Sequence, residues 1–195
     1  MASLWQVTRN PYGRAVYDWL TDHGVTATVM YEYRRRLDGE AADGHHTPAD
    51  DTEPTVGVGD PAALDFGGTD PPLAERREDE ELIVATTDGT VRGYLFLTVD
   101  ATLRVHPLER ELSFEGAYVR RVFVHPDYRE QGIASATLRA ALDRARERGA
   151  RTATALVAAD NRPSQWLFES HEFERVRRRV YGRVGSLSWR RVDEL

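Results

Sequence analysis

Residues 117–159 predict a strand, a helix and a second strand in direct succession, and this order limits the fold class sharply. Residues 117–124 and 152–159 are short runs rich in strand-forming side chains, and residues 132–148 between them carry apolar side chains at helical spacing. Gly149 follows the last helical residue, as is typical of a helix C-terminus. Two strands joined by a helix form a parallel pair with a right-handed crossover. The sequence therefore predicts an α/β fold.

The other predicted elements fit a mixed sheet flanked by helices. Residues 81–87 and 90–99 flank Asp88-Gly89, a turn pattern typical of a two-residue β-hairpin. Pro11 and Pro163 each favour a helix start. Further helices are predicted at 11–23 and 163–171, and further strands at 25–34, 174–181 and 187–192. The apolar stripe of the first helix comprises Tyr12, Ala15, Val16, Trp19 and Leu20.

Residues 38–75 differ in composition from the rest of the chain. They contain ten acidic residues, six glycines, five prolines and no basic residue. Their few large apolar residues cannot offset the entropy lost on ordering. We therefore expect a long acidic Gly/Pro-rich loop or insert in a single domain spanning 1–195, with a substrate lid as the functional alternative.

Composition excludes several classes of site. The chain has no cysteine, which rules out disulfides, thiolate metal ligands and a cysteine nucleophile. Its basic residues are all arginines and its net charge is −6. Residues 1–100 contain 8 arginines and 19 acidic residues, whereas residues 101–195 contain 18 and 13, so the second half is the one expected to face an anion. The sequence shows neither the apolar run of a signal peptide at its start nor a later apolar stretch long enough to span a membrane, so we expect a cytoplasmic protein.

The stretch from Val122 to Ser135 carries most of the chemical information. It places the end of a predicted strand, a turn and a helix start in succession. A helix start offers unpaired backbone N–H groups and partial positive charge, which favour a phosphate. Gly132 and Ala134 are small enough for close approach, and Arg129 adds a positive charge. A tight strand-to-helix turn without a ligand explains the same residues, so both interpretations stay open.

Residues 129–134, Arg-Glu-Gln-Gly-Ile-Ala, resemble the acetyl-CoA signature Q/R-x-x-G-x-G/A of the general-control-type N-acetyltransferase (GNAT) superfamily. The preceding strand and its Val-His-Pro-Asp-Tyr turn are also similar. Residues 161–173 resemble the family element Asn-x-x-(small)-x-x-x-(Tyr)-Glu-x-x-Gly-Phe. The resemblance covers residues 80–192, whereas the first eighty residues match poorly.

The resemblance implies a GNAT-like mixed, splayed sheet with acetyl-CoA held in the split. Strand residues would hydrogen-bond the pantetheine arm, the helix start would cradle the pyrophosphate, and the Val124 amide would polarise the thioester carbonyl. The cofactor-binding residues that it implies are Val122, Phe123, Val124, Arg129, Glu130, Gln131, Gly132, Ile133, Ala134, Ser135, Asn161 and Phe168.

Three positions depart from the family pattern. Phe168 stands where the family has a tyrosine that protonates the departing CoA thiolate, and a phenyl ring cannot donate a proton. Glu172 replaces the glycine before the last phenylalanine, and Leu156 stands where some members carry a glutamate base. The resemblance therefore assigns neither the general acid nor the general base.

Four residues are the candidates for proton transfer, and each has a structural alternative. Tyr118 and Tyr181 could supply an acid, although strand tyrosines more often pack or hydrogen-bond locally. His125 titrates in a useful range but suits a turn cap. Glu115 could reach an acceptor through water but suits an exposed surface position.

Two other patterns are weaker evidence for a binding site. His45-His46 lies near Asp43, Asp50 and Asp51 without metal-ligand spacing, so no metal site is predicted. The arginines between 175 and 183 suggest a nucleic-acid face, but the acidic chain lacks base-stacking motifs, which favours a solvated strand face.

The sequence as a whole predicts an acetyl-CoA-dependent N-acetyltransferase in which a primary amine attacks the bound thioester directly. An acyl-CoA-binding sensor without catalysis is the main alternative, favoured by Phe168, and a domain with a vestigial site is a second. The expected partners are acetyl-CoA and an amine acceptor, small molecule or protein, with no nucleic acid or membrane. A homodimer is left open.

Overall fold

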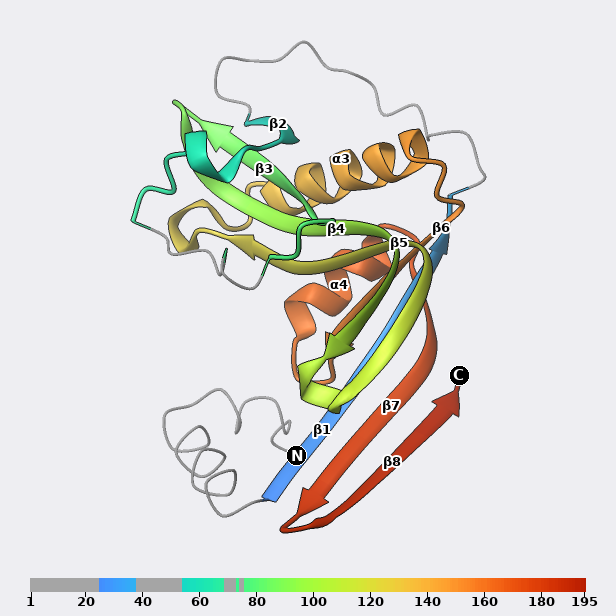
Figure 1. Cartoon of the computed structure of the whole chain (residues 1–195). Helices are drawn as coiled ribbons and strands as arrows, with labels where there is room; N and C mark the ends of the chain where they lie inside the picture. The colour runs from blue at the N-terminus through green and yellow to red at the C-terminus, as the bar shows by residue number, and fades with distance from the viewer. Residues whose placement is uncertain (1–24, 38–53, 69–72, 74–75) are drawn as a thin grey trace. The chain divides into compact units, whose positions relative to one another are not determined.

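The computed structural model describes residues 25–37, 54–68, 73 and 76–195 (Figure 1). The predicted helix 11–23 lies outside these residues. The described strands are hydrogen-bonded in the order β2-β3-β4-β5-β6-β1-β7-β8, which confirms the predicted mixed α/β fold. Contacts divide the chain into two compact units. Among the described residues, the α3 unit comprises those within 35–101 and 113–155, and the β7 unit comprises those within 25–34, 102–112 and 156–195.

The α3 unit contains the predicted hairpin and crossover. Strands β2, β3 and β4 are antiparallel, and the β3–β4 turn is Asp88-Gly89 with φ of 50° and 74°, as a two-residue hairpin turn requires. Strands β5 and β6 pair in parallel only from Ala117 to Val119, although β5 continues to Val124. Its complete elements are β2 (Thr55–Val58), β3 (Glu81–Thr87) and α3 (Ile133–Glu147). It also holds β4 (Thr90–Val105) up to Ala101, β5 (Arg110–Val124) from Ser113, and β6 (Thr152–Ala158) up to Ala155; the remaining residues of these strands belong to the β7 unit.

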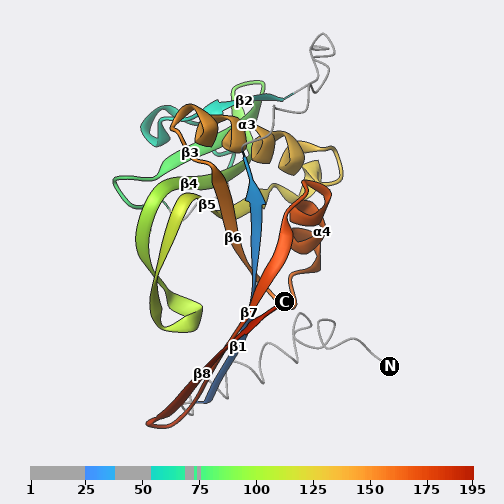
Figure 2. The same ribbon diagram turned by 90° about the vertical axis from the view of Figure 1, so that its right-hand side faces the viewer.

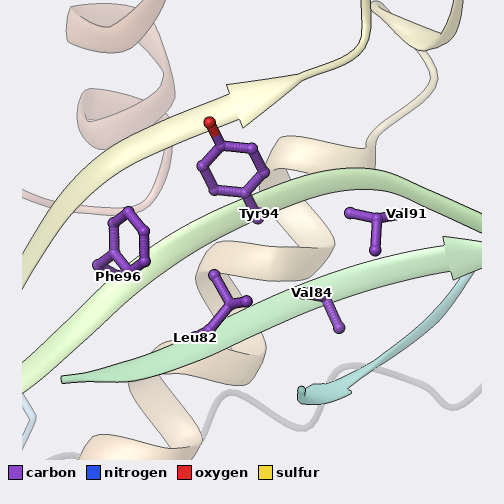
Figure 3. Packing of buried hydrophobic residues seen from close by; sticks show 5 residues of the cluster. All are labelled: Leu82, Val84, Val91, Tyr94 and Phe96. Carbon is purple, nitrogen blue, oxygen red and sulfur yellow. The ribbon is translucent and has the colours of Figure 1, made fainter. Parts of the chain in front are cut away.

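The two faces of the β3–β4 hairpin have different neighbours. Helix α3 packs on one side, against β3 and β2. The other side carries a buried cluster in which Leu82 lies opposite Phe96 and Val84 lies opposite Tyr94 on the two strands (Figure 3). The cluster consists of Leu82, Val84, Val91, Tyr94 and Phe96.

The second half of the acidic segment belongs to this packing. Leu64, Phe66 and Leu73 are partly buried against the cluster, and β2 pairs with β3. The Val91 N–H also donates to the Asp65 carbonyl at 2.8 Å. None of the described residues 54–68 and 73 is fully buried, but three of their apolar side chains pack on the hairpin in part, which composition did not predict. A few well-spaced apolar side chains suffice for this packing, because the hairpin already presents an apolar face. The interpretation of 38–75 as an insert or loop stays a prediction.

The β7 unit is built on an antiparallel sheet in which β7 lies between β1 and β8 (Figure 2). The predicted strands are confirmed, and each extends a few residues further. The sequence missed the turn at η3, through which β4 runs on into β5 as a long hairpin. The elements are β1 (Val25–Arg36), η3 (His106–Leu108), α4 (Arg162–Ser170), β7 (Glu174–Val184) and β8 (Leu187–Glu194).

The arginines of β7 pair with carboxylates. Glu32 is 2% exposed and accepts from Arg179 at 2.6 Å and from Arg177 at 3.3 Å. Arg183 pairs with Glu109 at 3.3 Å. The expected solvated face is therefore partly a buried ion-pair network. Burial of the Glu32 carboxylate is tolerable only because several guanidinium groups compensate its charge.

Helix α4 is attached to β1 and β7 through Tyr33. The Tyr33 hydroxyl donates to Glu169 Oε1 at 2.8 Å and accepts from the Arg175 guanidinium at 2.8 Å. The Tyr33 ring stacks on Phe168 with centroids 6.2 Å apart. Burial, assisted by the hydrogen bond to Glu169, raises the pKa of Tyr33 to about 12.

We expect Phe66→Ala to lower the free energy of unfolding by about 1–3 kcal/mol, less than for a fully buried phenylalanine because the ring is only partly covered. The measurement is urea denaturation. Val58→Ala is the control, since Val58 is 57% exposed and its truncation should change the free energy by less than about 0.5 kcal/mol. Equal, small effects of both variants would show that the segment does not pack on the hairpin.

We expect the parent chain to lose more stability than Tyr33→Phe between about pH 10 and pH 12. An unfolded tyrosine loses its proton near pH 10, whereas folded Tyr33 keeps it to about 12. The folded state therefore binds more protons in that window, so stability falls as pH rises. Denaturation midpoints of both chains across this range test the difference, and parallel curves would contradict it.

Candidate functional site

The last residues of β5 follow a break in regular strand geometry. Arg121 has φ of 57°, the left-handed region, which non-glycine residues rarely adopt. Val122, Phe123 and Val124 follow it and end the strand. A left-handed residue in a strand is typical of a bulge, which frees backbone groups from the ladder and re-aims those that follow. The extended backbone of Val122–Val124 therefore lies at the position that is predicted to bind a pantetheine arm.

A short turn after β5 is held by side chains. His125 Nδ1 accepts from the Asp127 N–H at 3.4 Å, and the His125 N–H donates to the Arg92 carbonyl at 2.8 Å. Arg129 Nε donates to the Val124 carbonyl at 3.3 Å. The guanidinium of Arg92 lies 4.3 Å from the centroid of the Tyr128 ring, a cation–π contact. The turn η4 (Pro126–Tyr128) is thereby tied to β4 and β5.

The start of α3 has the geometry of an anion site. Gly132 has φ of 77°, and a Cβ built on it would meet no atom within 4 Å. The first bond of the helix joins the Ala136 N–H to the Gly132 carbonyl at 2.9 Å. The backbone N–H groups that precede Ala136 in the first turn of a helix have no acceptor within that helix. Open space beside left-handed Gly132 leaves this end accessible to a phosphate.

Gly93 of β4 determines where α3 can begin, and the sequence did not reveal this role. A Cβ at Gly93 would lie 2.7 Å from Ile133 Cγ2 and 3.1 Å from the Phe123 carbonyl oxygen. A side chain at position 93 would therefore force the helix start, and to a smaller extent the end of β5, to shift away from β4. A glycine inside a strand pattern is the signal that could have predicted this close approach.

In the β7 unit, the start of α4 carries Asn161. Its side chain caps the helix by accepting from the Ser164 N–H at 3.4 Å. Gln165, fully buried, donates to the carbonyls of Ala158 and Ala159 at 3.1 and 3.0 Å. Gln165 thus ties the end of β6 to α4. The sequence analysis missed Gln165, because a glutamine in a helix is ordinarily exposed.

Phe168 lies on the buried side of α4. It is 3% exposed, and its ring packs on Tyr33 and on Phe173, whose centroid is 5.1 Å away. Asn161 and Phe168 belong to the β7 unit, whereas residues 122–135 belong to the α3 unit. The structure thus brings together ten of the predicted cofactor-binding residues on one strand–turn–helix segment, and the roles of all twelve stay predictions.

The proton-transfer candidates have local partners. Tyr181 is 1% exposed and donates to Glu109 Oε2 at 2.5 Å, and this hydrogen bond raises the pKa of Tyr181. Tyr118 is buried and stacks on Phe114 with centroids 4.0 Å apart. Glu115 is exposed, and its carbonyl accepts from the Thr152 hydroxyl at 2.9 Å. Together with the capping by His125, these contacts favour the structural alternatives.

The described part of the chain has neither a metal-binding cluster nor a membrane-spanning helix. It holds no group of three or more His, Cys, Asp or Glu side chains arranged to bind a metal ion. His45 and His46 lie outside it. Among its helices, none has the length and apolar character that crossing a membrane requires.

Several solved structures share the fold. An acetyltransferase of the GNAT family from Novosphingobium aromaticivorans is 19% identical, with TM-score 0.53 over 82% of this chain and 65% of its own. A GCN5-related N-acetyltransferase from Sphaerobacter thermophilus is 15% identical, with TM-score 0.52 over 95% and 58%. The GCN5-related glucosamine N-acetyltransferase region of a fungal multi-domain β-N-acetylglucosaminidase is 16% identical, with TM-score 0.57 over 90% and 23%. The chain thus spans less than two thirds of each, and these likenesses show the fold.

The family itself is shown by sequence. No curated protein matches the chain. The model of the acetyltransferase (GNAT) family matches residues 48–173, which include the turn before α3, the whole of α3 and α4. With the strand–turn–helix geometry around Gly132, the match establishes that this chain belongs to the GNAT acetyltransferase family.

Proposed function

We propose that the protein transfers an acetyl group from acetyl-CoA to a primary amine by direct attack in a ternary complex. The observation that carries the proposal is the accessible start of α3, where left-handed Gly132 leaves open space. Acetyltransferase activity in general is what membership of the family implies. The amine acceptor, the ternary complex and the residues involved are the parts that we propose.

The proposed roles follow from the local geometry. The backbone of Val122, Phe123 and Val124 would bind the pantetheine arm as an added strand. Residues 130–135 and the Arg129 guanidinium would hold the pyrophosphate. Arg129 already lies against the Val124 carbonyl, so its charge is positioned beside the helix start. The donor set suits an anion, since it combines backbone N–H groups with an arginine.

The proposed chemistry requires little from side chains. A neutral amine adds to the thioester carbonyl, the Val124 N–H stabilises the oxyanion, and the carbon–sulfur bond then breaks. The nitrogen loses a proton and the thiolate gains one. Tyr181 is a poor donor, because its proton is engaged by Glu109 and its pKa is raised. Positioning and the oxyanion contact would then supply much of the acceleration, with water as a proton carrier.

A second candidate function is acyl-CoA sensing without catalysis. Phe168 favours it, because the ring is buried among Tyr33 and Phe173 and offers no proton. Release of free CoA thiol in the presence of a panel of amines separates enzyme from sensor. Thermal stabilisation by acetyl-CoA separates a sensor from a vestigial site. A homodimer and a cytoplasmic location stay predictions.

We expect Gly132→Glu to weaken CoA binding by at least about tenfold, because the new carboxylate enters the space reserved for the pyrophosphate. Isothermal titration calorimetry with CoA measures the change. Gly149→Glu is a matched control at the other end of α3, since Gly149 has φ of 82° and also faces open space. Equal binding by both variants would place the CoA site elsewhere.

We expect Phe168→Tyr to raise the rate of acetyl transfer little or not at all, because the pocket around the ring is packed for a phenyl group. A buried hydroxyl without a partner costs about 1–3 kcal/mol, so the melting temperature should fall. Phe173→Tyr, also at 3% exposure, is the control for an added hydroxyl in the same core. A gain of about a hundredfold confined to Phe168→Tyr would instead show that thiolate departure had lacked an acid.

A further inference from the structure

Strands β2 and β8 lie at the two ends of the order of described strands, and β8 is the longer and more regular edge (Figure 1). Strand β2 has four residues and includes Gly57, whereas β8 has eight residues without glycine or proline. The register of β8 with β7 runs without a bulge. Proteins usually protect an edge strand from pairing with another chain by shortness, proline or a bulge, and β8 has none of these features.

The outer side of β8 presents the backbone groups of Arg190, Val192 and Glu194. The Leu195 N–H donates to the Val176 carbonyl at 3.0 Å and continues the β7–β8 register. In an antiparallel pair, residues that bond the neighbouring strand alternate with residues whose N–H and C=O groups point to the other side. The odd-numbered residues of β8 therefore bond β7, and the even-numbered residues face the open edge.

The sequence from Trp189 to Leu195 is complementary to itself when two copies run antiparallel. A twofold axis at Val192 places each basic residue opposite an acidic one and each apolar residue opposite another apolar one. It also pairs even-numbered residues with even-numbered ones, as the outward backbone groups require. The pairs between the two copies are Trp189 with Leu195, Arg190 with Glu194, Arg191 with Asp193, and Val192 with Val192.

Charge selects this register over its neighbours. Moving the twofold axis by one residue in either direction pairs a charged residue with its own copy, Arg191 in one case and Asp193 in the other. Like charges directly opposite one another destabilise a strand pair, whereas opposite charges stabilise it. Among the neighbouring symmetric registers, the axis at Val192 therefore has the most favourable charge pairing.

The charged side chains of this stretch are accessible in addition to their contacts within the chain. Arg191 Nε donates to Asp193 Oδ1 at 2.6 Å, and the Arg191 side chain is 74% exposed. Glu194 accepts from Arg177 at 2.7 Å, and the Glu194 side chain is 71% exposed. Arg190 donates to a backbone carbonyl at 3.3 Å and is exposed as well. Carboxylate and guanidinium groups each form several hydrogen bonds, so these groups can take a second partner.

The apolar positions of the stretch are exposed too. Trp189 is 51% exposed, Leu195 64% and Val192 43%. Paired across the axis, each of these side chains would contact an apolar side chain of the second copy, which removes apolar surface from water.

We propose that two copies of the chain form a homodimer by antiparallel pairing of their β8 strands around a twofold axis at Val192. Main-chain hydrogen bonds from the outward groups of Arg190, Val192 and Glu194 join the two edges, as in other complexes formed by strand addition. The ion pairs of Arg190 with Glu194 and of Arg191 with Asp193 determine the register. The same surface serves on both copies, so the assembly is closed and both open edges are used.

The absence of cysteine allows a direct test of the register by disulfide cross-linking. Val192→Cys places one thiol at the axis, where the two Cα atoms of position 192 would lie about 5.5 Å apart, within reach of a disulfide. Leu187→Cys is the matched control, because Leu187 is exposed on the same strand but its two copies would lie about 33 Å apart. Under mild oxidation by diamide, we expect Val192→Cys to form the linked dimer at least about tenfold faster. Equal rates would overturn the proposal.

Charge exchange tests the pairing in solution. Arg191→Asp places an acid opposite Asp193 of the second copy and should weaken the dimer by about tenfold or more in sedimentation equilibrium. Combining Arg191→Asp with Asp193→Arg exchanges the two charges and should restore the dimer, because the register pairs position 191 with position 193. Arg139→Asp makes the same change of charge at an exposed position of α3 and should leave the dimer unchanged.

Three results of the sedimentation experiment would overturn the proposal: a parent chain that stays monomeric up to about 100 µM, a dimer that Arg191→Asp leaves intact, and a double variant that stays as weak as Arg191→Asp. All substituted positions are exposed, so the variants are expected to fold; the exception is Asp193, which is partly exposed and is substituted only together with Arg191. Neither experiment involves acetyl transfer, so this inference and the proposed function stand or fall separately.

Discussion

The close approach of Gly93 to Ile133 and to the Phe123 carbonyl determines the geometry of the candidate site. A methyl group at Gly93 would lie 2.7 Å from an Ile133 side-chain carbon and 3.1 Å from a backbone oxygen. The absence of a side chain at Gly93 therefore lets the end of β5 and the start of α3 approach β4 without a shift. The turn between them is short and left-handed at Glu130 and Gly132, which places the first amides of α3 beside the last residues of β5.

Arginine pairs with buried acid in both units. Glu80, 2% exposed, accepts from both ends of the Arg120 guanidinium at 2.5 Å, and Glu32 is enclosed by Arg177 and Arg179. The planar guanidinium group can satisfy both oxygens of a carboxylate at once, which an ammonium group cannot. In a chain without lysine, much of the arginine content near β7 is thus used to neutralise its own carboxylates. The arginines of the second half of the chain are therefore less available to an external anion than the net positive charge of that half suggests.

Much of the fold was predictable because its signals are local. Asp88-Gly89 indicated the hairpin, and the run from 117 to 159 indicated the crossover. The omissions arose where packing depends on distant partners. Composition did not predict that Leu64 and Phe66 pack in part on a face supplied by β3 and β4. The turn at residues 106–108 was missed for a related reason, since its Glu109 is held by Tyr181, 72 residues away.

The sequence by itself determined the family and the position of the candidate cofactor segment. Both follow from contiguous residues, Arg129 to Ala134 and 161–173, whose spacing along the chain is the signal. Only the tertiary structure decided which polar side chains are already engaged. From the sequence, three residues are candidates for proton transfer: Tyr181, Tyr118 and His125. In the structure, Tyr181 is hydrogen-bonded to Glu109, Tyr118 stacks on Phe114, and His125 accepts a hydrogen bond from the Asp127 amide. The physical reason is that a side chain's availability depends on which atoms surround it, and those atoms come from residues far away in the chain.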